Sequence, residues 1–219
     1  MTLAIFDLDN TILRGDSDSA WLSFLIQHDQ VDKERVERMN QKFYEDYVGG
    51  HLDFDEYSEF AYGILNSIHI SKLKILRKEY FKEKVMPMIC PNARDRFEMH
   101  RKRNHTLIIS TATNEFVCRP VVEYLKTDYL IATKLEISDD GYTGRHYGAP
   151  NFGEGKVTNM HLWLAENPGH QLATAYFYSD SINDLPLLEA VGYPRPVNVD
   201  EQLREVSKKK GWRIITFNK

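Results

Sequence analysis

Cysteine is scarce in this sequence, and long apolar runs are missing from it. The two cysteines, Cys90 and Cys118, lack the partner spacing of a zinc site. A disulfide between them is conceivable, but we expect two reduced thiols, as in a reducing cytoplasm. No segment approaches the ~20 apolar residues of a membrane span, and no signal-peptide pattern opens the sequence. We therefore expect a cytoplasmic protein without a membrane partner.

No charge of one sign dominates either. Lysine and arginine total 28 and the acids 32, for a formal net charge of −4, and the two signs are mixed throughout. This balance offers no electrostatic reason to expect nucleic acid or an acidic membrane as a partner. The local excess at Lys208–Lys210 is typical of a solvated helix end. The composition leaves the oligomeric state open.

Three short apolar runs predict buried strands. They cover Leu3–Phe6, His105–Ile109 and Thr174–Tyr178, and each is followed at once by an acidic or hydroxyl residue. Apolar strands that end in polar residues are typical of an open α/β sheet. In such sheets the ligand binds at the carboxyl ends of the strands.

The segment between the first two runs has a helical pattern of apolar residues. Apolar residues at helical spacing indicate helices around Trp21 and Met39, and the pair Gly49-Gly50 ends the second helix. Two more helices are expected over Phe54–Leu65 and Ser71–Val85. We interpret this segment as a helical insertion in the α/β domain.

Two prolines, Pro87 and Pro91, mark the return from the insertion to the main domain. The 219 residues suffice for one core domain and a smaller accessory one. We therefore predict a core made of residues 1–15 and 86–219 and a helical cap made of residues 16–85.

Further elements are expected downstream of the second strand. Glu115–Leu125 has a helical pattern that Pro120 interrupts. Residues 128–147 alternate around Asp139-Asp140-Gly141, which indicates a β-hairpin. A helix is expected over Val157–Glu166.

The first strand ends in two carboxylates. Asp7 and Asp9 are two residues apart, so extended geometry places both side chains on one side of the chain. Such a pair repels unless a cation lies near it. Mg²⁺ prefers oxygen ligands of this kind and would also neutralise the oxygens of a phosphate. The alternative is a polar turn that merely ends a strand.

A second acidic loop follows the third strand. Asp180 and Asp184 are four residues apart and face one point if a helical turn begins there. The alternative is a helix N-cap provided by Ser181 or Asp180. Lys156, near a helix start, is a third candidate, although most lysines are simply solvated.

The second strand ends in groups that can bind a phosphate oxygen. Thr111 or Ser110 offers a hydroxyl, and Ala112 offers a backbone N–H. Each of these features is weak by itself. Their order along the chain, each at a strand end, makes the combination strong.

In this combination the chain resembles the haloacid dehalogenase (HAD) superfamily, and within it the phosphoserine-phosphatase-like subfamily IB, which includes histidinol-phosphatases. The matching motifs are Asp7–Thr11, Ile108–Thr113, Lys156 and Ser179–Asp184. The resemblance covers essentially the whole chain. It implies an α/β fold with an open, parallel, Rossmann-like core sheet and a helical cap of the C1 type.

The resemblance also implies a role for each motif residue. Asp7 would attack phosphorus and become an aspartyl-phosphate, and Asp9 would act as general acid and then as general base. Mg²⁺ would be held by Asp7, the backbone carbonyl of Asp9, and Asp180, while Asp184 would orient metal-bound water or Lys156. The groups expected to bind the transferred phosphoryl group are Thr111, the Ala112 amide, Lys156 and Asn183. A slip of one residue, to Ser110, stays open for the hydroxyl.

The resemblance implies a phosphatase of a small phosphomonoester, but the sequence departs from phosphoserine phosphatases. Their Ser-Gly-Gly is replaced by Thr111-Ala112-Thr113, and the cap has no clear match to the arginine that binds the substrate carboxylate. Phosphoserine is therefore disfavoured. Histidinol phosphate is our first expectation, with other small monoesters or a lysophospholipid phosphate behind it. A phosphotransferase with the same intermediate and a non-catalytic binding module are the alternatives.

The expected cap contains aromatic and acidic residues that suit a cationic aromatic substrate. The aromatic residues are Trp21, Phe43, Tyr44, Tyr47, Phe54, Tyr57, Phe60 and Tyr62. The acids are Asp16, Asp18, Asp53 and Glu56. Most such residues serve core packing or a solvated surface, so the sequence does not select among them.

Overall fold

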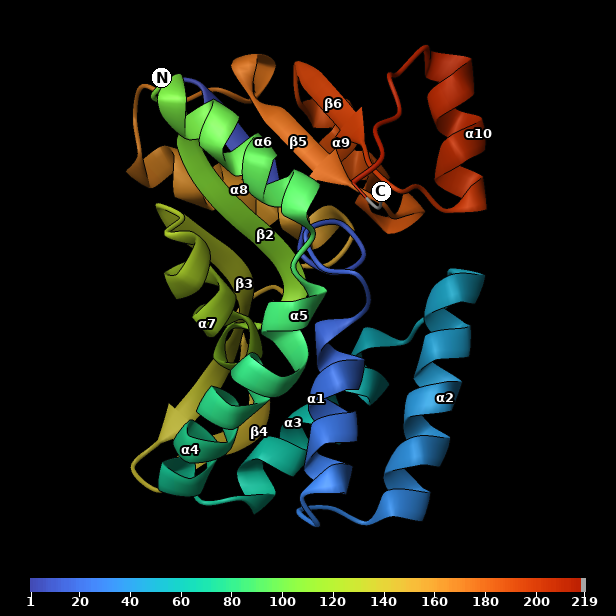
Figure 1. Cartoon of the computed structure of the whole chain (residues 1–219), viewed down its shortest axis with the longest axis vertical. Helices are drawn as coiled ribbons and strands as arrows, with labels where there is room; N and C mark the ends of the chain where they lie inside the picture. Colours follow the sequence, from blue (N-terminus) through green and yellow to red (C-terminus); the bar gives the residue numbers. More distant parts are fainter. Residues whose placement is uncertain (218–219) are drawn as a thin grey trace.

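Strands from distant parts of the chain form one sheet in residues 1–217, the part that the computed structural model describes (Figure 1). The six strands are β1 (Leu3–Phe6), β2 (Thr106–Asn114), β3 (Tyr129–Ser138), β4 (Gly141–Tyr147), β5 (Tyr176–Ser179) and β6 (Tyr193–Pro196). Their order is β4-β3-β2-β1-β5-β6, and every pair is parallel except the β3–β4 hairpin. The predicted open α/β sheet is confirmed. Residues 218 and 219 of the predicted core lie outside the described part.

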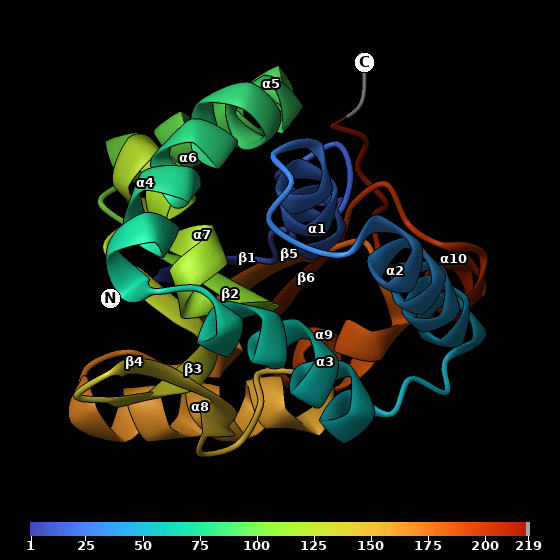
Figure 2. The same cartoon turned by 90° about the horizontal axis from the view of Figure 1, so that it is seen from below.

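Strand β1 lies inside the sheet and is buried on both faces. Leu3 and Ile5 join one hydrophobic cluster, whereas Ala4 and Phe6 join the other, as the alternation of side chains along a strand requires. The first cluster is completed by helices α8 (Glu154–Glu166), α9 (Leu185–Ala190) and α10 (Glu201–Lys210). The second is completed by helices α6 (Pro91–Lys102) and α7 (Glu115–Leu125), on the opposite face (Figure 2).

The segment between β1 and β2 is helical, as predicted. Its helices are α1 (Ser17–Gln27), α2 (Lys33–Gly49), α3 (Phe54–Ser67) and α4 (Ile70–Tyr80), followed by the π-helical turn η1 (Phe81–Val85) and α5 (Met86–Met88). The side chains of Asp16, Asp32 and Asp53 accept backbone N–H groups at the starts of α1, α2 and α3. Gly50, with a φ of 73°, ends α2.

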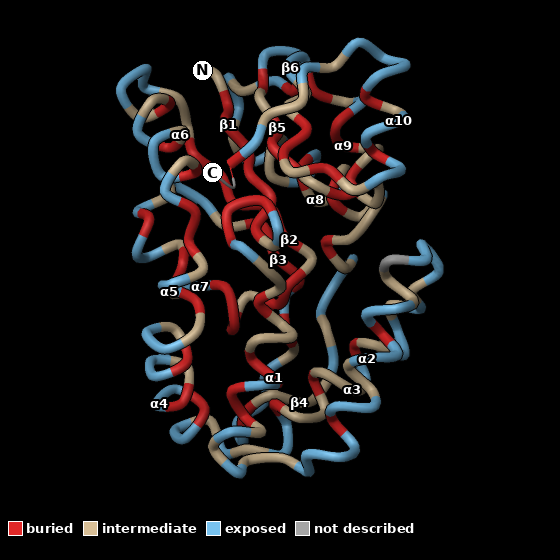
Figure 3. The backbone as a smooth tube through the Cα atoms, turned by 45° about the vertical axis from the view of Figure 1, so that its right-hand side comes forward, coloured by how far each residue is buried: buried red, intermediate tan, exposed pale blue. Residues whose placement is uncertain are grey.

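The helical segment packs directly on the β3–β4 hairpin, which extends beyond the rest of the sheet (Figure 1). Gly144 of β4, with a φ of 84°, lies so close to α3 that a Cβ there would be 3.6 Å from the Cα of Gly63. The second hydrophobic cluster also continues from Phe6 into the helical segment through Trp21 and Tyr80. Buried residues therefore run without a break between the two halves (Figure 3). The boundary between cap and core stays a prediction.

Helix α7 contradicts the expected interruption at Pro120. The helix continues through the proline to Leu125. Proline has no N–H to donate to the carbonyl of Phe116, four residues earlier. Arg77 of α4 supplies the missing donor, because its Nη1 lies 3.1 Å from that carbonyl oxygen. A tertiary hydrogen bond therefore replaces the helical one.

Strand β6 was not predicted, because two of its four residues are prolines. Proline cannot donate to a neighbouring strand, so it is tolerated mainly at sheet edges. Strand β6 is an edge strand and pairs with β5 alone. The predicted hairpin turn at residues 139–141 and the basic helix end at Lys208–Lys210 are both confirmed.

Two further sequence expectations concern the cysteines and the membrane. Cys90 and Cys118 are both buried and no disulfide joins them. None of the helices within residues 1–217 has the length and apolar character needed to cross a membrane.

Candidate active site

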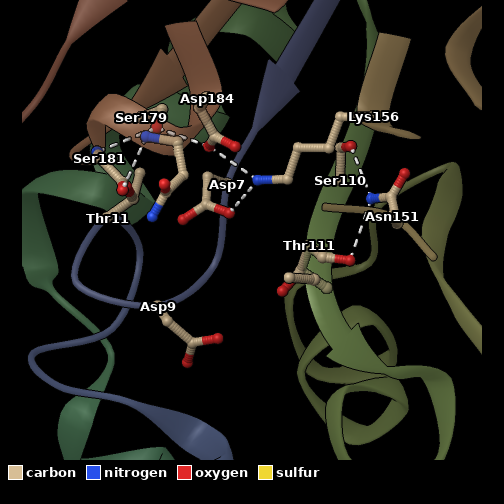
Figure 4. A network of polar contacts seen from close by, with 12 residues as sticks. Asp7, Asp9, Thr11, Ser110, Thr111, Asn151, Lys156, Ser179, Ser181 and Asp184 are labelled. Atoms are coloured by element: carbon tan, nitrogen blue, oxygen red, sulfur yellow. Dashed lines mark hydrogen bonds and ion pairs between the residues drawn. The ribbon is translucent and has the colours of Figure 1, made fainter. Parts of the chain in front are cut away.

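Three predicted residues meet at the carboxyl ends of β1 and β5 (Figure 4). Lys156 Nζ lies 2.7 Å from Asp7 Oδ1 and 2.7 Å from Asp184 Oδ2. All three side chains are buried. The hydroxyl of Ser179 donates to Asp184 Oδ2 at 2.6 Å and so fixes that carboxylate against Lys156.

The charges at this point do not balance. Burial, and after it repulsion from Asp184, raise the pKa of Asp7 to about 6 although Lys156 opposes the rise. Burial, then Asp7 and Asp184, raise the pKa of Asp180 well above its ordinary value. Burial alone would lower the pKa of Lys156, but the two neighbouring carboxylates outweigh it and the pKa is raised. One ammonium therefore faces three carboxylates.

The donor set at this point suits Mg²⁺. Asp7 and Asp180 offer carboxylate oxygens, and the uncompensated negative charge favours a small divalent cation. Thr11 Oγ1 donates to Asp180 Oδ1 at 3.1 Å and orients that carboxylate. Within residues 1–217, no three His, Cys, Asp or Glu side chains are grouped to hold an ion by themselves. An ion here would also need backbone oxygens and water, which Mg²⁺ accepts readily.

The structure distinguishes the two candidate hydroxyls of the second motif. Thr111 lines the cavity that contains Asp7, together with Ala112 and Asn183. Ser110 instead accepts a hydrogen bond from Asn151 Nδ2 at 3.1 Å, away from that lining. Of the two hydroxyl residues, Thr111 is therefore the one that lines the cavity. Strand β2 extends past both, to Asn114, with a shift of register after Thr111.

Asn151 is a structural residue that the sequence did not reveal. Its buried amide Nδ2 also donates to the carbonyls of Thr111 and Ile131, both at 3.0 Å, which anchors the loop before α8 to two strands. Lys156 follows in the first turn of α8. A lone asparagine in a loop has no distinctive pattern, so only the fold shows that it positions both the lysine and the strand end.

Asp9 lies apart from the Asp7–Lys156 pair and faces the helical segment (Figure 4). Its Oδ1 accepts from the backbone N of Ser17 at 2.6 Å, and its Oδ2 accepts from the hydroxyl of Thr113 at 2.8 Å. Burial, then repulsion from Asp16 and Asp7, raise the pKa of Asp9 well above its ordinary value. A carboxyl group with a raised pKa can carry a proton near neutral pH, as a general acid must.

A cavity of about 530 Å³ joins these groups to helices α1, α2 and α3. Of the aromatic residues named from the sequence, those lining it are Phe43, Tyr44, Tyr47, Phe54 and Tyr57. The acids Asp16 and Asp18 also line it, whereas Asp53 caps α3 and Glu56 pairs with Lys42. Lys156 is the one basic residue in the lining contributed by residues 1–217. Away from Lys156 the cavity is thus acidic and aromatic.

Asp18 is held firmly in the cavity wall. The hydroxyl of Tyr57 donates to its Oδ2 at 2.6 Å, and Asn114 Nδ2 donates to its Oδ1 at 3.3 Å. Burial, then repulsion from Asp16, raise the pKa of Asp18 to about 7. These hydrogen bonds fix an acid in the wall of the cavity.

The family follows from a direct comparison. The model of the haloacid dehalogenase-like hydrolases matches residues 4–189. The chain belongs to this family. Its relatives within the haloacid dehalogenase-like hydrolases include a histidinol-phosphatase of Neisseria meningitidis, 41% identical over 98% of both chains. A probable phosphatase of Mycobacterium tuberculosis is 28% identical and is covered over 76% of its length.

Solved structures extend the comparison. A protein of unknown function from Bordetella pertussis superposes with a TM-score of 0.92 at 37% identity, covering 99% of both chains. A phosphoserine phosphatase holding an analogue of its phospho-aspartyl intermediate superposes with a TM-score of 0.72 over 99% of this chain and 93% of that one. At 17% identity the latter shows the fold alone. The family and its phosphatase members support a phosphoric monoester hydrolase.

Proposed function

We propose that this haloacid dehalogenase-like hydrolase is a Mg²⁺-dependent phosphatase that cleaves a small phosphomonoester through an aspartyl-phosphate on Asp7. The observation that carries the proposal is the buried contact of Asp7 with Lys156, at the acidic end of a substrate-sized cavity. A carboxylate in that position is a suitable nucleophile, because it is oriented and shielded from bulk water.

In the first step, a carboxylate oxygen of Asp7 attacks phosphorus and the ester P–O bond breaks. Asp9 gives its proton to the departing alkoxide. In the second step, water attacks phosphorus, Asp9 takes up a proton from the water, and the bond between phosphorus and Asp7 breaks. Inorganic phosphate leaves and both aspartates return to their initial state. The groups proposed to bind the phosphoryl oxygens are Thr111, the Ala112 amide, Lys156 and Asn183.

Asp7, Asp180 and the backbone carbonyl of Asp9 would hold Mg²⁺. When bound, the ion supplies positive charge to the phosphate oxygens and to the acidic cluster. Asp184 would act through Lys156, since its carboxylate contacts that ammonium. In this arrangement Lys156 pairs with Asp7 and Asp184, and Asp180 is the residue of the second acidic loop that would hold the metal.

The proposed substrate is a cationic aromatic monoester, with histidinol phosphate as the first candidate. Asp16 and Asp18 can bind an ammonium group, and the aromatic lining can pack on an imidazole ring. The 41% identity to a histidinol-phosphatase supports this choice. Because Lys156 is committed to the phosphate end, the described lining offers no second cation for the carboxylate of phosphoserine.

The test is a panel of phosphorylated metabolites assayed for phosphate release with Mg²⁺. We expect histidinol phosphate to be turned over with a kcat/KM at least about tenfold above that of phosphoserine, a difference of ~1.4 kcal/mol. Asp7→Asn should abolish turnover while circular dichroism stays unchanged. Full activity of Asp7→Asn would rule out the covalent intermediate, and a preference for phosphoserine would rule out the proposed substrate.

A cytoplasmic location without nucleic-acid or membrane partners remains part of this proposal. The near balance of basic and acidic residues supports the absence of nucleic-acid and membrane partners. Fractionation of cells, with the protein followed by an antibody, would test the location directly.

A further inference from the structure

We propose that Thr113 is a positioning residue for Asp9, which it holds in the orientation needed to protonate the leaving group. This inference rests on the proposed function. Thr113 is buried, and its hydroxyl donates to Asp9 Oδ2 at 2.8 Å, while the backbone N of Ser17 donates to Asp9 Oδ1 at 2.6 Å. Each oxygen of the carboxylate is therefore tied to a different element, β2 and α1.

The position of Thr113 is fixed by contacts of its own. Its backbone N donates to Thr111 Oγ1 at 3.2 Å, so the hydroxyl hydrogen of Thr111 stays available for a phosphate oxygen. The hydroxyl of Ser17 lies 3.3 Å from Thr113 Oγ1. Tyr80 of α4 in turn donates to the carbonyl of Ser17 at 2.6 Å. Thr113 thus links the proposed phosphate-binding hydroxyl to the proposed general acid.

The hydrogen bonding also decides where Asp9 can carry a proton. The threonine hydroxyl has a single hydrogen, and Asp9 Oδ2 receives it. A proton bound to Asp9 must therefore sit on a carboxylate lone pair that accepts neither the Thr113 hydroxyl nor the Ser17 N–H. Since Asp9 lines the cavity, that proton can be directed at the leaving oxygen.

Thr113→Val tests this role cleanly. Valine keeps the branched shape and the backbone N–H that binds Thr111, and it removes only the hydroxyl. An alkoxide needs a proton to leave, whereas p-nitrophenolate does not. We therefore expect kcat/KM for an alkyl ester without an amine, which does not depend on Asp18, to fall about tenfold or more, as part of a general-acid contribution of roughly 10²–10⁴-fold. For p-nitrophenyl phosphate, kcat/KM should change less than about threefold.

Two further variants serve as controls. Asp9→Asn should show the same dependence on the leaving group with a larger loss, and Thr113→Ser should restore the alkyl ester activity. Ser17→Ala keeps its backbone N–H to Asp9 and loses only the hydroxyl beside Thr113. Ser17→Ala should show the same pattern of kcat/KM losses on the two esters as Thr113→Val, but with a smaller loss on the alkyl ester. It replaces Thr113→Val if that variant does not fold.

The possible outcomes distinguish a failure of the role proposed for Thr113 from a failure of the proposed phosphatase function. Equal losses on both esters, or no loss on the alkyl ester, would show that Thr113 does not position Asp9. A wild-type protein inactive toward both esters would overturn the proposed function, and the role of Thr113 with it. If Thr113→Ser does not recover the alkyl ester activity, the hydroxyl of Thr113 is not what positions Asp9.

Discussion

Single residues decide which charge a substrate meets in the cavity. Asp16 and Asp18 line the cavity, whereas Asp53, which caps a helix just as Asp16 does, lies outside that lining. The difference lies in side-chain direction, which residue type does not reveal. Selectivity for a cationic substrate should therefore depend on Asp16 and Asp18 rather than on total acidity.

Asp18→Asn should weaken the binding of an amine substrate specifically. Asparagine retains an oxygen that can accept from Tyr57, and it loses the negative charge together with the longer hydrogen bond from Asn114. We expect the KM for histidinol phosphate to rise about tenfold, which is ~1.4 kcal/mol. The KM for p-nitrophenyl phosphate, which has no amine, should stay constant. Glu56→Gln, outside the cavity lining, is the matched control. Equal changes for both substrates would argue against an ammonium site.

At the scale of an element, helix α7 depends on a neighbouring helix. Arg77 of α4 donates to the Phe116 carbonyl that Pro120 cannot serve, and its guanidinium also lies 4.6 Å from the ring of Phe116. The helical pattern around the proline was therefore a better guide than the proline itself. The hydrogen bond from Arg77 compensates for the N–H that Pro120 lacks, so the helix is not interrupted.

A double-mutant cycle can measure that contact. We expect Arg77→Met to lower the free energy of unfolding by about 1–3 kcal/mol, because a buried carbonyl loses its donor. In a Pro120→Ala background the new backbone N–H can reach the Phe116 carbonyl, so the same change should cost less. Urea unfolding of the four proteins gives the coupling energy. An identical cost in both backgrounds would show that Arg77 acts through the aromatic ring alone.

Helix α6 is tied to the sheet by a buried histidine. His100 Nε2 lies 2.9 Å from the hydroxyl of Tyr178 on β5, and its Nδ1 lies 2.8 Å from Nδ1 of His105. Burial first, then His105 and nearby arginines, lower the pKa of His100 to about 3. In the unfolded chain its pKa is ~6.5. The stabilisation from His100 is thus fully present above pH ~6.5 and is lost as the pH falls toward 3.

This window predicts a pH-dependent mutational effect. Between about pH 7.5 and 5.5, the unfolded wild type gains a proton at His100 that the folded protein does not, so wild type loses stability there. His100→Gln has no such site. The difference in unfolding free energy between wild type and variant should therefore shrink at the lower pH. Urea titrations at the two pH values measure it, and a constant difference would mean that the pKa of His100 is the same in the folded and unfolded protein.

At the scale of the whole molecule, the acidic cluster assembles from both ends of the chain. Asp7 follows β1 and Asp180 follows β5, 173 residues later, and the parallel pairing of these strands brings the two carboxyl ends together. Their mutual repulsion is a cost of the fold in the absence of a cation. Binding of a divalent ion should consequently stabilise the protein globally.

Mg²⁺ should raise the melting temperature without any substrate. At a concentration of about 100 times its Kd, binding to the folded state alone adds ~2.7 kcal/mol. Asp180→Asn should lose most of the shift, whereas Asp18→Asn, elsewhere in the cavity, should retain it. Thermal unfolding of the three proteins in Mg²⁺ and in EDTA measures these shifts. Equal shifts in wild type and Asp180→Asn would place the ion elsewhere.

The sequence alone was sufficient for the local and chemical features of this protein. Four consecutive apolar residues before an acid predicted β1 with its correct bounds, and residue type at the strand ends and at a helix start selected Asp7, Lys156 and Asp184, which the fold brings into contact. These features depend on near neighbours and on residue type. They can therefore be predicted from the sequence alone.

Only the tertiary structure decided how distant residues meet. It separated Thr111 from Ser110, placed Asn151 beneath the strand end, turned Asp9 toward Thr113, and aimed Asp18 but not Asp53 into the cavity. It also accommodated Pro120 and the prolines of β6. Each of these outcomes depends on a partner far away in sequence or on the direction of a side chain, and neither is encoded in the spacing of residues along the chain.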